Sequence, residues 1–326
     1  MGWLLFGLIG GVILSDLIVR GIYARLILVR FETKPLFQAA RAKPNPQAEP
    51  IAFSTQDGYV LRGSLHPPTT GAPAGLILFC PELDGSHWTA SHYCQGLLAA
   101  GFAVLSFDFR NQGESDHQPG YEPLHWPTLH EANDLKAAIA FLKSRPDLAT
   151  LPWGVMGISR GGQLALWAMT QEPRFQAVCC EGAYDSQELQ LFFTLRWGAL
   201  YLPRWLHRIC PLWHYQGTLW LVRTVSEFKR AVRYLSLYSQ LARVMRRPVL
   251  LIAGDRDNYV HPEVGRALLR RIGSAHNRFW LVPHAKHNLA RVIDSEAYDQ
   301  RIAEFFLTQL KQTRLVDPVG EPCAAA

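Results

Sequence analysis

The sequence lacks the patterns of metal-binding, disulfide-rich and nucleic-acid-binding proteins. Its six cysteines form no C-x-x-C pair, and a chain of 326 residues can bury a full core without disulfides. No Lys/Arg run, zinc-ligand spacing or RNA-binding signature accompanies the net charge of +6. We therefore expect reduced thiols, no metal ion, no organic cofactor and no nucleic-acid partner.

Charge is also scarce, and one long apolar run stands at the N-terminus. Charged residues make up 18% of the chain and hydrophobic residues 48%, which is typical of a globular protein. Residues 3–19 are nearly all apolar, with no basic segment before them and no signal-peptide cleavage site directly after them. Three arginines follow the run at positions 20, 25 and 30. The apolar run predicts a membrane-associated protein with a transmembrane or interfacial helix, and the positive-inside rule places the body of the protein in the cytoplasm. Asp16 favours the alternative of a helix docked on the rest of the protein.

Hydrophobic periodicity predicts an α/β fold after that segment. Eight apolar runs have the length of strands: 51–54, 59–65, 75–80, 103–107, 153–156, 177–180, 249–252 and 278–282. Helical patterns separate most of them, at 88–100, 129–143, 161–170, 264–272 and 297–312. Strands alternating with helices predict a mainly parallel eight-stranded sheet with helices on both faces.

The same pattern divides the chain into segments. We expect a membrane-associated helix at 1–30, a Pro-rich linker at 31–48, an α/β core at 49–184 and 247–312, and a tail at 313–326. More than sixty residues of helical character interrupt the alternation, which is too long for a simple connection. We interpret residues 185–246 as a helical cap.

A serine lies in a turn motif between a predicted strand and a predicted helix. Gly157-Ile158-Ser159-Arg160-Gly161 has the form G-x-S-x-G, in which small residues on both sides let the backbone close around a strained serine. The N-terminus of the following helix favours a developing oxyanion. Ser159 is therefore the candidate nucleophile.

Two later loops offer an acid and a base. The strand at 249–252 is followed by Asp255 and Asp257, and the strand at 278–282 is followed by His284 and His287. Loops at the carboxyl ends of parallel strands meet at one edge of a sheet, so these side chains should approach Ser159. A serine nucleophile needs a base oriented by a third group.

From about residue 49 to residue 312 the chain resembles the α/β-hydrolase superfamily, particularly its esterase, lipase and serine-aminopeptidase-like branches. The acid loop of that superfamily reads G-x-x-D-x-x-V, which implies Asp257 rather than Asp255 as the acid. Its base loop implies His287 rather than His284. The segment 108–115 resembles the D-x-R-G-x-G-x-S turn of these proteins, with Asn111 at the first glycine.

The resemblance also implies an oxyanion hole made of two backbone N–H groups. One follows the nucleophile and belongs to Arg160. The other belongs to the turn after the strand at 75–80, where Leu83 is the candidate. Pro81 and Glu82 stand where the superfamily commonly has His and Gly, so the sequence departs from the pattern there.

These residues predict a serine hydrolase that cleaves a carboxylic ester or related acyl bond through an acyl-enzyme. The predicted cap combines tryptophans, tyrosines and arginines, which fits either a hydrophobic, lipid-like acyl substrate at a membrane or an ordinary cap core with a solvated basic face. An acyltransferase, thioesterase or peptidase would use the same triad. A non-catalytic membrane scaffold with this fold is the alternative outside enzymes.

Overall fold

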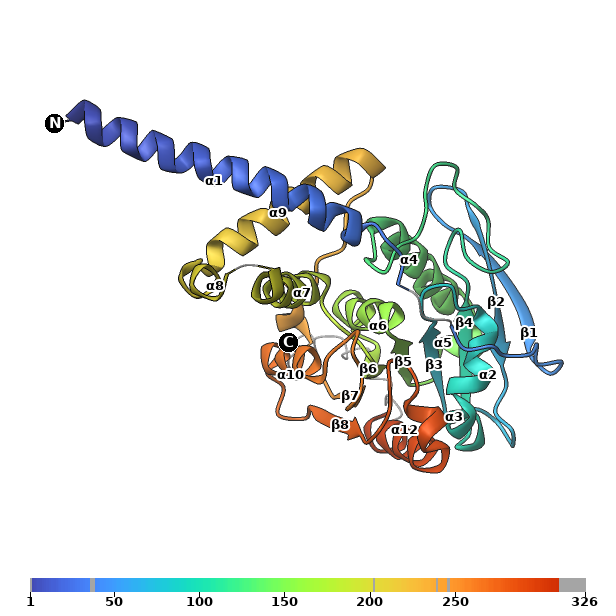
Figure 1. Ribbon diagram of the computed structural model, residues 1–326. Coiled ribbons are helices and arrows are strands. Elements are labelled where there is room, and N and C mark those ends of the chain that lie inside the picture. The colour runs from blue at the N-terminus through green and yellow to red at the C-terminus, as the bar shows by residue number, and fades with distance from the viewer. Residues whose placement is uncertain (1, 36–38, 202, 239, 245–246, 311–326) are drawn as a thin grey trace, which may run out of the picture.

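The computed structural model describes residues 2–35, 39–201, 203–238, 240–244 and 247–310. Eight strands form one sheet in the order β1-β2-β4-β3-β5-β6-β7-β8 (Figure 1). They are β1 Glu49–Ser54, β2 Val60–His66, β3 Gly75–Cys80, β4 Phe102–Phe107, β5 Trp153–Ile158, β6 Phe175–Glu181, β7 Val249–Gly254 and β8 Arg278–Val282. The β1–β2 and β2–β4 pairs are antiparallel, and all other pairs are parallel. The mainly parallel eight-stranded sheet predicted from the sequence is confirmed.

Helices cover both faces of the sheet. One face packs against α4 Leu129–Ser144, α6 Arg160–Gln171 and α10 Pro262–Ile272. The other packs against α2 Ala90–Tyr93, α3 Gln95–Ala99, α11 Ala290–Ile293 and α12 Ser295–Gln309. Within β3, Leu76 and Leu78 belong to the first core, whereas Ile77 and Phe79 belong to the second. Alternate side chains of a strand point to opposite faces, so a continuous apolar run serves both cores.

The core also contains the short helices η1 His87–Thr89 and α5 Pro146–Ala149. The single helix expected at 88–100 is divided into η1, α2 and α3. The break between α2 and α3 falls at Cys94, which leaves the helical conformation (φ −108°, ψ 16°).

A helical insert separates β6 from β7. It contains α7 Ser186–Tyr201, α8 Arg204–Ile209, α9 Leu212–Arg230 and the short η2 Leu241–Arg243. The term "insert" below means α7, α8 and α9. Their position between two neighbouring strands agrees with a cap at 185–246. The domain boundaries as a whole stay a prediction, and the tail at 313–326 lies outside the described residues.

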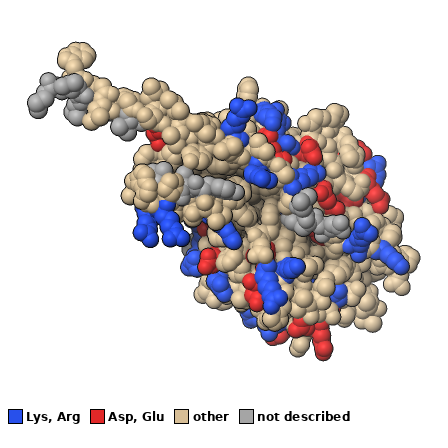
Figure 2. Space-filling model, viewed as in Figure 1, with Lys and Arg blue, Asp and Glu red and all other residues tan. Residues whose placement is uncertain are grey.

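The N-terminal helix α1 Gly2–Phe31 lies along α9 of the insert, and its first half projects from the rest of the molecule (Figure 1). This projecting part carries few charges (Figure 2). Nearer its end the helix joins a third core, in which Ala24 and Phe31 are buried with Trp126, Val222 and Tyr234.

The predictions of a transmembrane helix and of a membrane-associated protein with a cytoplasmic catalytic domain were wrong. In the part of the chain that the structure describes, no helix has the length and apolar character needed to cross a bilayer. The charges within α1 explain the error. Asp16 forms an ion pair with Arg20 (Oδ2–Nε 2.5 Å) and a contact with His214 of α9 (Oδ1–Nδ1 2.7 Å). The carboxylate that interrupts the apolar run therefore joins α1 to the insert.

Candidate active site

Ser159 occupies the turn between β5 and α6 with a positive φ (φ 53°, ψ −115°). Glycine is needed on both sides of it, because a Cβ at Gly157 would overlap the carbonyl oxygen of Gly161. A Cβ at Gly161 would overlap the carbonyl oxygen of Cys80. The Ser159 N–H donates to the carbonyl oxygen of Glu181 (2.7 Å), which ties the turn to β6. The turn thus holds a strained serine at the carboxyl edge of the sheet.

The three side chains predicted as nucleophile, base and acid lie together. Ser159 Oγ is 2.8 Å from His287 Nε2, and His287 Nδ1 is 2.7 Å from Asp257 Oδ2. Asp257 follows β7 and His287 follows β8, so three parallel strands each supply one group. All three side chains are largely shielded from solvent.

Backbone hydrogen bonds orient the carboxyl group of Asp257. Its Oδ1 accepts from the N–H of Tyr259 (2.8 Å) and of Val260 (2.7 Å), so Oδ2 is left for His287. A carboxylate can only accept hydrogen bonds, so Nδ1 of His287 carries the proton and Nε2 is the acceptor facing Ser159. This is the tautomer that general-base catalysis needs.

Asp255 and His284, the alternative acid and base in the two loops, lie apart from the contacts that join Ser159, His287 and Asp257. Asp255 is exposed, and its backbone N–H donates to the carbonyl oxygen of Val282 (N–O 3.0 Å). His284 is exposed in a turn with φ 63°. The side chains of both residues face solvent.

The two predicted oxyanion donors flank the serine turn. Arg160 is the first residue of α6, where backbone N–H groups have no acceptor within the helix. Leu83 is buried in the turn after β3, and a Cβ at Gly161 would also overlap the carbonyl oxygen of Pro81, so the two turns are in contact. The positive φ of the 81–85 turn falls on Asp84 (60°) and not on Glu82. The side chain at Glu82 therefore places no strain on the backbone there.

A family model described as the alpha/beta hydrolase family matches residues 66–304. The chain belongs to the alpha/beta hydrolase family. Membership of this family supports a hydrolase activity for the protein.

Relatives and solved structures agree with this assignment. An uncharacterized protein of Mycobacterium tuberculosis is 25% identical over 262 residues, which cover 80% of this chain and 79% of that protein. The thiohydrolase apmlB of Arthrinium phaeospermum is 31% identical over 132 residues, which cover 40% of this chain and 41% of that protein. The structure of an esterase from Pyrococcus furiosus superposes with a TM-score of 0.61 at 20% identity, over 85% of this chain and 98% of that chain. At this identity the structural likeness concerns the fold alone.

The Arg160 side chain of this alpha/beta hydrolase is completely buried behind the serine turn. Its Nη2 lies 2.5 Å from Glu131 Oε1 at the start of α4, at an ion-pair distance without the angle of a hydrogen bond. Burial would raise the pKa of Glu131, but the Arg160 guanidinium and the hydroxyl of Tyr121 hold it below its usual value. Glu131 Oε2 also accepts from the N–H of Thr128 (2.7 Å). The buried pair fixes the start of α6 against the start of α4.

Asp108 and Arg110 of the turn at 108–115 bind to different parts of the protein. Asp108 accepts from the N–H of His87 (2.5 Å) and lies 2.9 Å from its Nδ1. Arg110 forms ion pairs with Asp57 and Asp134, each at 2.6 Å. Hydrogen bonding to Arg110 lowers the pKa of Asp57 to about 2.

Sequence reasoning missed a buried glutamate beneath the His287 loop. Glu181 ends β6, and its carboxyl group accepts from the N–H of Ala290 (2.9 Å) and from the hydroxyl of Tyr298 (2.9 Å). Burial raises its pKa to about 7. The available signal was an acidic residue directly after the apolar run 177–180. Since Ala290 is three residues after His287, Glu181 helps to position the histidine loop.

A second buried glutamate lies nearby. Glu82 accepts from the N–H of Ala40 (2.9 Å) and from the hydroxyl of Tyr93 (3.2 Å), and burial raises its pKa. Glu82 is thus bonded to residues on two other segments and braces the turn that carries Leu83. In the described residues, no group of three or more His, Cys, Asp or Glu side chains could hold a metal ion.

We expect Glu181→Gln to remove part of the pH dependence of stability. Because the pKa of Glu181 is about 7 in the folded state and about 4.5 in the unfolded chain, the folded protein binds the extra proton between these values. The free energy of unfolding of the wild type should therefore fall as pH rises from about 4.5 to 7, by up to about 3 kcal/mol from this group. Denaturant unfolding at pH 5 and pH 7.5 measures the difference.

The matched control is Glu296→Gln, which changes an exposed glutamate of α12. It should retain the pH dependence of the wild type, and Glu181→Gln should be the less pH-sensitive of the two. A part of the dependence should persist in both variants, because burial also raises the pKa of Glu82. Identical pH dependence in the two variants would contradict the assignment to Glu181.

Proposed function

We propose that the chain is a serine hydrolase that cleaves a carboxylic ester or related acyl bond through an acyl-enzyme. The observation that carries this proposal is the pair of contacts from Ser159 through His287 to Asp257, at 2.8 and 2.7 Å. These are the distances that general-base activation of a serine requires. The buried position of the group excludes bulk water, which strengthens its electrostatic interactions.

The proposed reaction has two halves. Ser159 Oγ attacks the carbonyl carbon while Nε2 of His287 takes the hydroxyl proton, and Asp257 stabilises the imidazolium. His287 then gives this proton to the leaving alcohol or thiol, and the acyl group stays on Ser159. A water molecule repeats the sequence and releases the acid.

Two backbone N–H groups are proposed to hold the oxyanion of each tetrahedral intermediate. Arg160 supplies one from the start of α6, and Leu83 supplies the other from the turn after β3. A donor of this kind contributes about 3 kcal/mol to stabilising the transition state. The contact between the two turns at Gly161 supports their cooperation.

We propose that the acyl group of the substrate is hydrophobic. A cavity of about 360 Å³ is lined by Trp126, Phe193 and Tyr259, among others. The ring of Tyr259 lies 5.1 Å from the ring of His287, measured between centroids. The cavity also has Arg30 and Lys34 in its lining, but most of its wall is apolar and aromatic, which favours an acyl chain as its occupant.

A thioester is the second proposed substrate class. It is supported by the 31% identity to the thiohydrolase apmlB over 132 residues. The chemistry would be the same, with a thiol in place of the alcohol as leaving group. Acyl transfer to an acceptor other than water would need only a different nucleophile in the second half-reaction.

A fluorophosphonate probe tests the proposed nucleophile directly. We expect the wild type to be labelled on the peptide that contains Ser159, because the probe reacts with activated serines. Parallel assays with p-nitrophenyl butyrate and an acyl thioester of the same chain length distinguish the two substrate classes. Absence of labelling, or labelling on another serine, would reject the proposal.

A further inference from the structure

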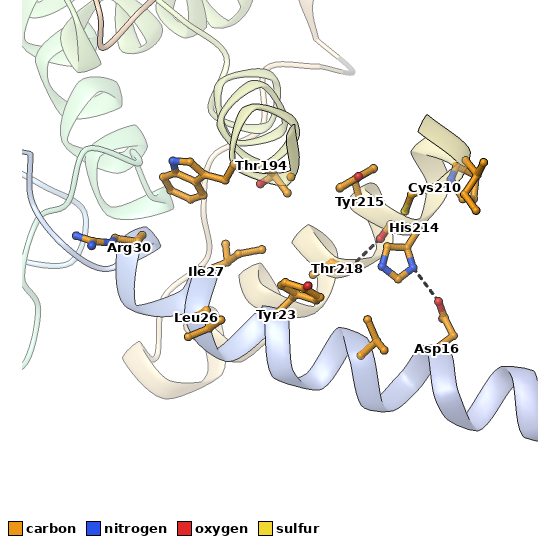
Figure 3. A pocket seen from close by; sticks show the side chains of 15 residues that line it. Asp16, Tyr23, Leu26, Ile27, Arg30, Thr194, Cys210, His214, Tyr215 and Thr218 are labelled. Carbon is orange, nitrogen blue, oxygen red and sulfur yellow. Dashed lines mark hydrogen bonds and ion pairs between the residues drawn. The ribbon is translucent and has the colours of Figure 1, made fainter. Parts of the chain in front are cut away.

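A cavity lies under the N-terminal helix, between α1 and the insert. Its volume is about 860 Å³. Figure 3 shows Tyr23, Ile27 and Arg30 of α1 on one side, and Thr194, Tyr215 and Thr218 of the insert on the other. The α1 residues that line it extend from Asp16 to Arg30, which is about 21 Å along a helix axis at 1.5 Å per residue. An extended palmitoyl chain has about this length.

This cavity leads toward the candidate active site. Ile27, Arg30, Thr194 and Trp197 line both it and the cavity of about 360 Å³ described above. Ser159 and His287 line neither of the two, but Tyr259 forms a wall of the smaller one and contacts the ring of His287. A chain whose carbonyl group lies at Ser159 would pass Tyr259, cross the smaller cavity and enter the larger one.

Helix α1, which forms one wall of the larger cavity, is bonded to the rest of the protein at both ends of that cavity. At the far end, Asp16 contacts His214, and the Arg20 guanidinium donates to the carbonyl oxygen of His214 (3.1 Å). At the near end, the ring of Phe31 stacks on Trp126 with centroids 5.3 Å apart, and the indole N–H of Trp126 donates to the carbonyl oxygen of Phe31 (2.8 Å). The cavity is therefore a built feature of the fold.

The helix also lies outside the segment that matches the family model, which begins at residue 66. The cavity-lining residues of α1 between its two charged ones are apolar or aromatic: Val19, Tyr23, Leu26 and Ile27. Of the charged ones, Asp16 at the far end is already paired with Arg20 and His214, and Arg30 at the near end is exposed to solvent. Such a cavity fits an uncharged, flexible hydrocarbon chain.

We propose that α1 and the insert form a binding site for the long acyl chain of the substrate, and that α1 makes the enzyme selective for long chains. The proposal rests on the proposed function for its reacting end, at Ser159. Ile27 lies where the two cavities meet, so its size controls how far a chain can extend.

Ile27→Trp tests the proposal by filling the junction. The measurement is kcat/KM for p-nitrophenyl esters from butyrate to palmitate. We expect the wild type to prefer the longer chains. Ile27→Trp should lower kcat/KM for palmitate at least tenfold, since about two buried methylene groups account for a tenfold change. The loss for butyrate should be much smaller than the loss for palmitate, because a short chain does not extend past the junction into the larger cavity.

Val29→Trp is the matched control. It introduces the same side chain on the same helix, at a position that is 64% exposed and lines neither cavity. We expect Val29→Trp to leave kcat/KM for both the butyrate and the palmitate ester unchanged. An equal loss for butyrate and palmitate in Ile27→Trp, or no loss for either, would overturn the proposal.

Fatty-acid binding separates this proposal from the proposed function. The fluorescent fatty acid cis-parinaric acid can be titrated into Ser159→Ala protein, in which binding does not depend on hydrolysis. Adding Ile27→Trp should weaken binding at least tenfold, and adding Val29→Trp should not. Equal binding in all three proteins would reject the acyl site even if ester hydrolysis is observed. The expected binding pattern without hydrolysis by the wild type would reject the proposed function alone.

Discussion

Ser159→Ala should lower kcat/KM for p-nitrophenyl butyrate by at least about three orders of magnitude, since loss of a triad nucleophile has effects of this size. The Oγ atom of Ser159 is the atom that would form the acyl-enzyme, and it lies 2.8 Å from Nε2 of His287. The fold should be preserved. Alanine keeps the Cβ of serine, so the backbone at φ 53° is neither relieved nor strained further.

The control for this substitution is Ser144→Ala, at an exposed position near the end of α4 whose hydroxyl bonds only to Phe141 in its own helix. Its activity and thermal unfolding should match those of the wild type. Thermal unfolding of Ser159→Ala should also stay close to the wild-type midpoint. Residual activity within about tenfold of the wild type would show that Ser159 is not the nucleophile.

Local patterns were sufficient to predict most of the α/β core. The run at 75–80 is apolar throughout, and β3 occupies it with every residue buried. Runs of this kind are typical of strands covered on both faces, whatever their partners are. The G-x-S-x-G motif was equally informative, because the glycines are needed for contacts within a few residues of Ser159 and with one adjacent turn.

Features that depend on distant parts of the chain could not be predicted in this way. Asp16 pairs with His214, 198 residues away, and no local pattern connects the two. The apolar run around Asp16 has the composition of a membrane helix, but in the structure the helix packs beside α9 and encloses a cavity. Glu181 was missed for a similar reason. Its partners Ala290 and Tyr298 belong to α11 and α12, more than a hundred residues later.

The second large effect is expected at His287. His287→Ala should lower kcat/KM for p-nitrophenyl butyrate by at least about three orders of magnitude, because a serine without its base is a weak nucleophile. Labelling of Ser159 by the fluorophosphonate probe should slow strongly for the same reason. Asp257→Asn should also reduce activity severely, since an amide in place of Oδ2 can favour the wrong imidazole tautomer, in which Nε2 cannot accept the serine proton.

The two loops contain their own matched controls. His284→Ala removes a histidine three residues earlier, and Asp255→Asn removes a carboxylate two residues before Asp257. Both side chains are exposed and lie outside the contacts that join Ser159, His287 and Asp257. We therefore expect each control to keep kcat/KM within about twofold of the wild type. If His284→Ala or Asp255→Asn lost activity as severely as its neighbour, the assignment of base or acid within that loop would be wrong. If His287→Ala retained activity within about tenfold, general-base catalysis by this histidine would be excluded.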